Sequence, residues 1–136
     1  MTKIGELQAR RMEWHADHQF LVELAEIKRS RHLTTEEEQK EQSAIAHKNE
    51  VYVKILELEP QAARERIEGL VTELEPNAHV QWDESRVPNS IRFRAVHRAT
   101  ETVLIESSGD WLAGEILDKT DPQLRALLNA WSNGRL

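Results

Sequence analysis

Histidines and carboxylates gather in the first third of the chain, and together they could bind a metal ion. His15, Asp17 and His18 lie within one helical turn, and His47 follows on a second predicted helix. Facing helices of carboxylate-rich bundles bind metals through such groups, usually in Glu-x-x-His pairs. None of these three histidines has a glutamate three positions before it. We therefore expect no metal and no cofactor, and metal-dependent activity at this cluster stays a second alternative.

Arginines form the other candidate site. Arg92, Arg94 and Arg98 fall at alternating positions along a predicted strand and its end, so we expect them on one side of a sheet. A row of guanidinium groups can bind phosphates or carboxylates. The competing interpretation is the solvated outer face of an antiparallel sheet, which such alternation also predicts. If the row binds anything, an acidic protein segment fits as well as nucleic acid.

Catalytic motifs give no support to an enzyme. Ser107-Ser108-Gly109-Asp110 is the only cluster of Ser, Gly and Asp, and it lacks the flanking glycines of a nucleophile elbow. It fits better as a cap between a strand and a helix. No Walker loop, GxGxxG or HExxH motif occurs. The chain has no cysteine, which excludes disulfides, thiolate metal sites and a cysteine nucleophile. We expect a protein that is not an enzyme.

Tryptophan is common here, with four residues against two Phe and one Tyr. Trp82, Trp111 and Trp131 are expected in the core of the second half. Trp14 lies on a weaker part of its predicted helix, where less of the chain can cover it, and exposed Trp often anchors interfaces. We predict that Trp14, with His18 and Leu21 nearby, contacts a partner.

Two long helices must position the first cluster. Residues 3–31 contain no Pro, and their apolar residues follow helical spacing. His32 to Thr35 forms the break. Thr34 with Glu37, or Thr35 with Glu38, then makes a capping box that starts a second helix over about 35–58. Because the connection is short, we expect an antiparallel helical hairpin.

The remaining elements form a small mixed domain. Pro60 suits the first turn of a third helix, whose apolar face is Ala63, Ile67, Leu70, Val71 and Leu74. The spacing then alternates, which predicts three short strands over residues 79–83, 91–95 and 102–106. A short helix over 109–118 and a last helix from Asp121-Pro122 to a stop at Gly134 complete the chain. The helices of 61–74 and 122–132 are expected to cover one face of the sheet.

Composition and charge narrow the function classes. At 136 residues, 39% hydrophobic and 31% charged, the chain has room for one compact domain with a helical extension. The net charge of −6 is concentrated in residues 1–76, which hold 11 Lys and Arg against 16 Asp and Glu. A surface with this excess of negative charge repels the phosphate backbone of nucleic acid. We therefore do not expect residues 1–76 to bind nucleic acid. We expect no secretory signal and no membrane span, and the absence of cysteine favours the cytoplasm.

These observations together predict an α+β protein. A long antiparallel helical hairpin over residues 1–59 is followed, over residues 60–136, by a third helix, a three-stranded antiparallel meander and two C-terminal helices. The apolar tracks of the hairpin are wide, so we expect a homodimer assembled largely through it. The predicted function is that of a non-enzymatic interaction, regulatory or adaptor module that binds another protein. Binding of nucleic acid or an anionic ligand through the arginine row is the alternative.

Overall fold

The computed structural model of the protein describes residues 2–84 and 87–132, and it is an α+β protein. Its internal contacts divide the chain into two compact units. The hairpin unit is Gly5–Leu58, and the sheet unit consists of Thr2–Ile4 together with the chain from Glu59 onward. We describe each unit by itself.

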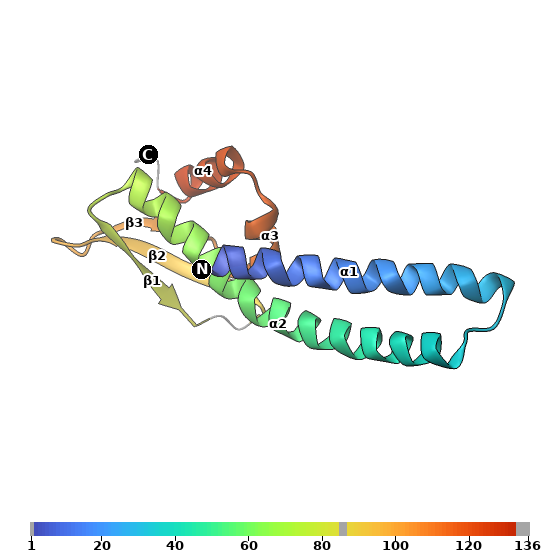
Figure 1. Ribbon diagram of the computed structural model, residues 1–136. Coiled ribbons are helices and arrows are strands. Elements are labelled where there is room, and N and C mark those ends of the chain that lie inside the picture. The colour runs from blue at the N-terminus through green and yellow to red at the C-terminus, as the bar shows by residue number, and fades with distance from the viewer. Residues whose placement is uncertain (1, 85–86, 133–136) are drawn as a thin grey trace. The chain divides into compact units, whose positions relative to one another are not determined.

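The hairpin unit contains two antiparallel helices (Figure 1). Helix α1 spans Lys3–Ser30, and α2 spans Thr35–Leu74, of which the part up to Leu58 belongs to this unit. Few side chains of this unit are buried, because within it each helix has only the other helix to cover it. The buried hydrophobic residues of the unit are Leu7, Leu24, Ala44, Val51 and Ile55.

The predicted capping box at the start of α2 is confirmed for Thr34 and Glu37. The Glu37 backbone N–H donates to the Thr34 hydroxyl at 3.1 Å, and the Thr34 N–H donates to the Glu37 carboxylate at 2.9 Å. These bonds satisfy two backbone donors that a helix start leaves free. Arg31 adds two hydrogen bonds to the same carboxylate, at 2.7 and 2.9 Å. The turn of the hairpin is therefore fixed by one glutamate with partners on both sides.

The predicted third helix is not a separate element. Helix α2 continues through Pro60 to Leu74 as one helix of 40 residues, so the predicted start at Pro60 was wrong. Proline lacks a backbone N–H and therefore removes one helical hydrogen bond, which usually kinks or ends a helix. Here the residues that follow it are tightly held, with Ala62 and Ala63 fully buried. Packing offsets the lost bond.

The sheet unit contains the predicted three-stranded meander. Its strands are β1 (Ala78–Asp83), β2 (Ser90–His97) and β3 (Val103–Glu106), all antiparallel in the order β1-β2-β3. A two-residue strand that we did not predict, β4 (Trp111–Leu112), pairs with β2 at Ser90 and Ile91. Two residues are too few to give an alternating pattern, so the sequence carried no signal for it.

The two C-terminal helices are present, and the cap of the second lies one residue before the predicted Asp121. Helix α3 is Ala113–Asp118 and starts four residues later than predicted, directly after β4. Helix α4 is Asp121–Ala130, and its cap is Thr120, whose hydroxyl accepts from Gln123 N. The predicted stop at Gly134 lies outside the described residues.

One face of the sheet and three helices enclose the core of this unit. The second half of α2 and α4 lie on the same side of the strands (Figure 1), as predicted. Phe93 of β2, only 1% exposed, packs against Trp82 and Trp131, with ring centroids 5.5 and 5.9 Å away. The other buried members of this core are Ala63, Ile67, Leu70, Val71, Ala78, Ile91, Ala95, Leu104, Ile105, Ala113, Ile116, Leu124 and Leu128.

Arg66 ties α2 to the short helix α3. Its guanidinium donates to the carbonyls of Ile116 and Leu117 at 3.0 and 3.1 Å, and to the Asp121 carboxylate at 2.8 Å. The last carbonyls of a helix have no partner within that helix. The guanidinium of Arg66 is the hydrogen-bond partner of two such carbonyls, and it also lowers the pKa of Asp121.

The Glu37 cluster makes hairpin stability depend on pH. The hydrogen bonds from Arg31 and Thr34 lower the pKa of Glu37 from 4.5 to about 2. A depressed folded-state pKa means that the contribution is complete above pH 4.5 and is lost as the pH falls through about 2. We expect Glu37→Gln to lower the melting temperature at pH 6 and to have little effect near pH 2. Thermal melts followed by circular dichroism would measure this, with Glu38→Gln as the control. A Glu37→Gln effect of equal size at both pH values would contradict it.

Candidate interaction surface

Helix α2 carries two apolar sides within the hairpin unit. Val51 and Ile55 are buried, at 1% and 7% exposure. Tyr52 and Leu56, each one position further along, are 50% and 39% exposed. A shift of one residue rotates a side chain by roughly 100° around a helix, so the second set faces away from the first. We call the exposed set Ile45, Tyr52, Val53 and Leu56 the α2 stripe.

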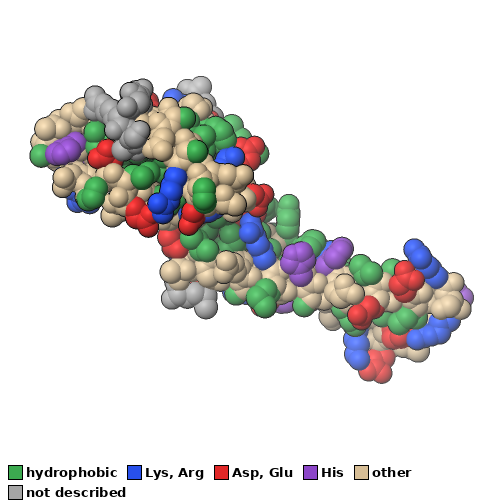
Figure 2. All heavy atoms as spheres, turned by 90° about the horizontal axis from the view of Figure 1, so that it is seen from above, with side chains coloured by type: hydrophobic (Ala, Val, Ile, Leu, Met, Phe, Trp, Pro, Cys, Tyr) green, Lys and Arg blue, Asp and Glu red, His purple; other side chains and the backbone are tan. Residues whose placement is uncertain are grey.

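Exposed large hydrophobic side chains are concentrated in the hairpin unit. Among the described residues, six of them lie there and two, Val87 and Leu112, lie in the sheet unit. Besides the α2 stripe, the hairpin exposes Met12 and Val22 on α1. Figure 2 shows hydrophobic side chains reaching the surface between charged ones along the hairpin. Clustered exposed apolar residues mark interaction sites, whereas scattered ones are ordinary.

Trp14 lies in a cluster that bridges the two hairpin helices. Its indole is half-buried and stacks on His18, with ring centroids 5.0 Å apart and planes 7° apart. His15 meets it edge-on at 5.3 Å. Lys48 of α2 places its ammonium 4.5 Å from the centre of the indole ring, within the range of a cation–π contact. Trp14 is thus partly covered by its own hairpin, with Leu21 also half-buried and His18 exposed.

The same lysine connects this cluster to the α2 stripe. Its Nζ lies 2.9 Å from His18 Nδ1, a distance at which the ammonium donates a hydrogen bond to the imidazole ring. Along α2, Ile45 is three residues before Lys48 and Tyr52 is four residues after it. Residues at these spacings are neighbours on a helix surface. One positive charge therefore borders the exposed apolar side chains.

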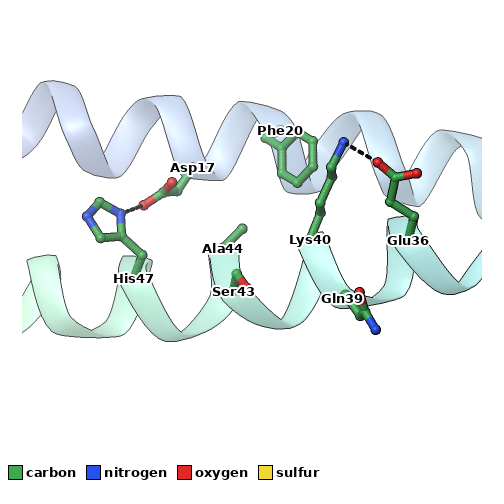
Figure 3. Close-up of a pocket in the computed structure, with 8 residues that line it drawn as sticks. All are labelled: Asp17, Phe20, Glu36, Gln39, Lys40, Ser43, Ala44 and His47. Atoms are coloured by element: carbon green, nitrogen blue, oxygen red, sulfur yellow. Dashed lines mark hydrogen bonds and ion pairs between the residues drawn. The ribbon is translucent and has the colours of Figure 1, made fainter.

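A groove of about 580 Å³ runs between the helices elsewhere on the hairpin (Figure 3). Asp17 binds His47 Nδ1 at 2.5 Å at one end, and Lys40 pairs with Glu36 at 3.2 Å at the other. The lining also includes Ser43, so the groove contains the residue types of a hydrolase triad. In Figure 3 the remaining ring nitrogen of His47 points away from Ser43. A histidine in that orientation cannot take the serine proton.

The predicted metal cluster is only partly assembled. The structure joins Asp17 to His47, whereas His18 bonds to Lys48 instead. An ammonium group beside an imidazole repels a metal cation. Within residues 2–84 and 87–132, no three side chains of His, Asp or Glu come together in a way that could hold a metal ion.

The arginine row is interrupted by acidic neighbours. Arg92 and Arg94 are exposed on β2, where the register pairs them with Asp83 and Gln81 of β1. Arg94 also lies opposite Glu106 of β3 and donates to Gln81 at 3.0 Å. Directly opposed residues share one face of a sheet, so Asp83 and Glu106 offset much of the positive charge.

Arg98 lies outside this strand. Strand β2 ends at His97, and Arg98 follows in the turn, where its Nε donates to the Ala78 carbonyl at 3.4 Å. The structure therefore brings two of the three predicted arginines together on the strand.

Comparison with protein-family models, curated protein sequences and solved structures finds no match to this chain. Among the helices of the described residues, none is both long enough and apolar enough to cross a bilayer.

The sequence did not predict the α2 stripe as a separate surface. Its helical spacing placed Ile45, Tyr52 and Leu56 in one apolar track together with Val51 and Ile55, and it did not assign Val53 to that track. That track is too wide for one neighbouring helix to cover. Its width was the only feature of the sequence from which an exposed apolar surface on this helix could be predicted. Which part stays exposed depends on how α1 sits against α2, which periodicity alone does not specify.

We expect an introduced carboxylate to affect stability differently on the two apolar sides of α2. We expect Tyr52→Asp to leave the melting temperature nearly unchanged, because position 52 is already half exposed to water. Val51→Asp should lower the stability by several kcal/mol, because it would bury an unpaired carboxylate. Thermal melts of both variants would measure this. Equal destabilisation would show that Tyr52 is covered within the chain.

Proposed function

We propose that the protein is a non-enzymatic interaction module, acting in the cytoplasm as an adaptor or regulator, and that its hairpin binds another protein. The α2 stripe carries this proposal. Ile45, Tyr52 and Leu56 share one side of the helix, and Val53 borders them three residues before Leu56. Each of the four side chains is at least 38% exposed. A stripe of this kind is what helix-in-groove recognition uses.

The aromatic residues in and near the α2 stripe also support binding to another protein. Tyrosine and tryptophan dominate the energetics of protein interfaces because they bury a large rigid area and retain a polar group. Tyr52 lies in the stripe, and Trp14 contacts Lys48, which is four residues before Tyr52 on α2. Our predicted contact residues Trp14, His18 and Leu21 thus belong to the same unit as the stripe, and Leu21 is half-buried.

The homodimer predicted from the sequence remains part of the proposal. Met12 of α1 is 73% exposed and Val22 is 42% exposed, so the hairpin offers apolar surface besides the α2 stripe. A two-fold interface uses the same patch on both copies. We propose that a second copy packs on the hairpin through this remaining surface.

The two alternatives have less support. The arginine row would need an uncompensated positive face to bind phosphates, but carboxylates lie opposite both of its strand residues. A metal-dependent activity would need further ligands around the pair of Asp17 and His47. We therefore propose neither nucleic-acid binding nor metal chemistry.

Co-purification from the native host tests the module directly. We expect the wild-type chain to recover a stable protein partner, and Tyr52→Asp with Leu56→Asp to lose it while the fold is retained. Lys40→Gln, on the groove side of α2, is the control and should keep the partner. Light scattering of the isolated chain should give the mass of two copies. Recovery of the same partner by the double variant would contradict the role of the stripe, and a monomer at high concentration would contradict the dimer.

A further inference from the structure

Lys48 differs from the other lysines of the hairpin unit. Lys28 pairs with Glu41 at 2.5 Å, Lys40 with Glu36, and Lys54 with Glu50 at 3.5 Å. Lys48 has no carboxylate partner among the described residues, and its contacts are the His18 imidazole and the Trp14 ring. An imidazole and an indole ring thus contact the ammonium group, and no carboxylate of the described residues neutralises its charge.

This charge lies at the border of the α2 stripe. Ile45 and Tyr52 are its neighbours at i−3 and i+4 on the same helix. A partner that covers the stripe must therefore also cover or approach the ammonium group. Covering a charge without pairing it carries a large desolvation cost. Charge complementarity thus restricts the partners that can bind here.

We propose that the α2 stripe binds an amphipathic helix of another protein whose apolar face is bordered by an Asp or Glu side chain, and that this carboxylate pairs with Lys48. The inference rests on the proposed function and names the class of partner. On binding, the ammonium exchanges a hydrogen bond to an imidazole for one to a carboxylate. The new bond adds the attraction between two opposite charges, which the imidazole does not supply.

A second copy of this chain fits the stripe less well. Glu41 of α2 lies four residues before Ile45, a spacing at which residues are neighbours on a helix surface, and it already pairs with Lys28 of its own chain. A second copy that offered this glutamate to Lys48 would have to break that pair. A separate partner with an unpaired carboxylate avoids that cost.

Two synthetic helical peptides test the inference on the full-length protein. Both carry the same leucine face; one has glutamates beside it, and the other has glutamines at the same positions. Calorimetry measures the binding of each peptide to the wild type, to Lys48→Gln and to the control Lys40→Gln. We expect the glutamate peptide to bind roughly fivefold more tightly to the wild type and to Lys40→Gln. With Lys48→Gln the two peptides should bind equally, and Tyr52→Asp should weaken both.

Several results would overturn the inference. One is a glutamate preference of the same size in wild type and Lys48→Gln, because the preference would then not come from Lys48. Another is that neither peptide binds at millimolar concentration. A third is that Tyr52→Asp converts a dimer into a monomer, which would place a second copy on the stripe. Binding of the native partner could require Tyr52 and Leu56 but not Lys48. That result would support the proposed interaction module and would contradict the proposal that the partner carries a carboxylate for Lys48.

Discussion

A helix in a two-helix hairpin can be covered along only one of its sides, and this constraint shapes the first unit of the protein. Helix α2 has apolar residues over a wider arc than α1 can cover. Val51 and Ile55 are buried, whereas Tyr52 and Leu56 stay exposed. Exposed apolar surface loses the stabilisation that burial would give, about 25 cal/mol per Å². A partner that covers the stripe recovers that free energy, which is the physical basis of the proposed function.

The polar contacts of the hairpin fit the same picture. Across the hairpin, Asp17 pairs with His47 and His18 bonds to Lys48. These adjacent cross-links hold the helices in register at mid-length, where the interior contains few buried residues. They also bring Lys48 against Trp14 and leave its charge unpaired at the border of the stripe. One set of side chains thus joins the two helices and sets the charge that a partner meets.

Features that depend on residues close together in the sequence could be predicted, whereas features that depend on contacts between distant segments could not. Two local signals gave correct elements, namely the capping box of Thr34 and Glu37 and the alternation around Phe93. The predicted serine cap before α3 was wrong, because the cap residue is Leu112 and no side chain caps it. The break at Pro60 was wrong because burial of the residues after it outweighs the lost hydrogen bond. The exposed stripe could be foreseen only as an excess of apolar width. The pairing of Lys48 with His18 and Trp14 depends on the register between two helices, for which the sequence has no local signal.

The central claim is that α2 has one closed and one open apolar side, and thiol labelling measures this most directly. The chain has no cysteine, so a single introduced thiol reports on its own position. Tyr52→Cys and Val51→Cys would each be treated with a thiol reagent at low protein concentration. We expect the thiol at position 52 to react nearly as fast as in the unfolded chain and the thiol at position 51 to be strongly protected. Equal protection of both thiols would contradict it, because the stripe would then be covered by its own chain.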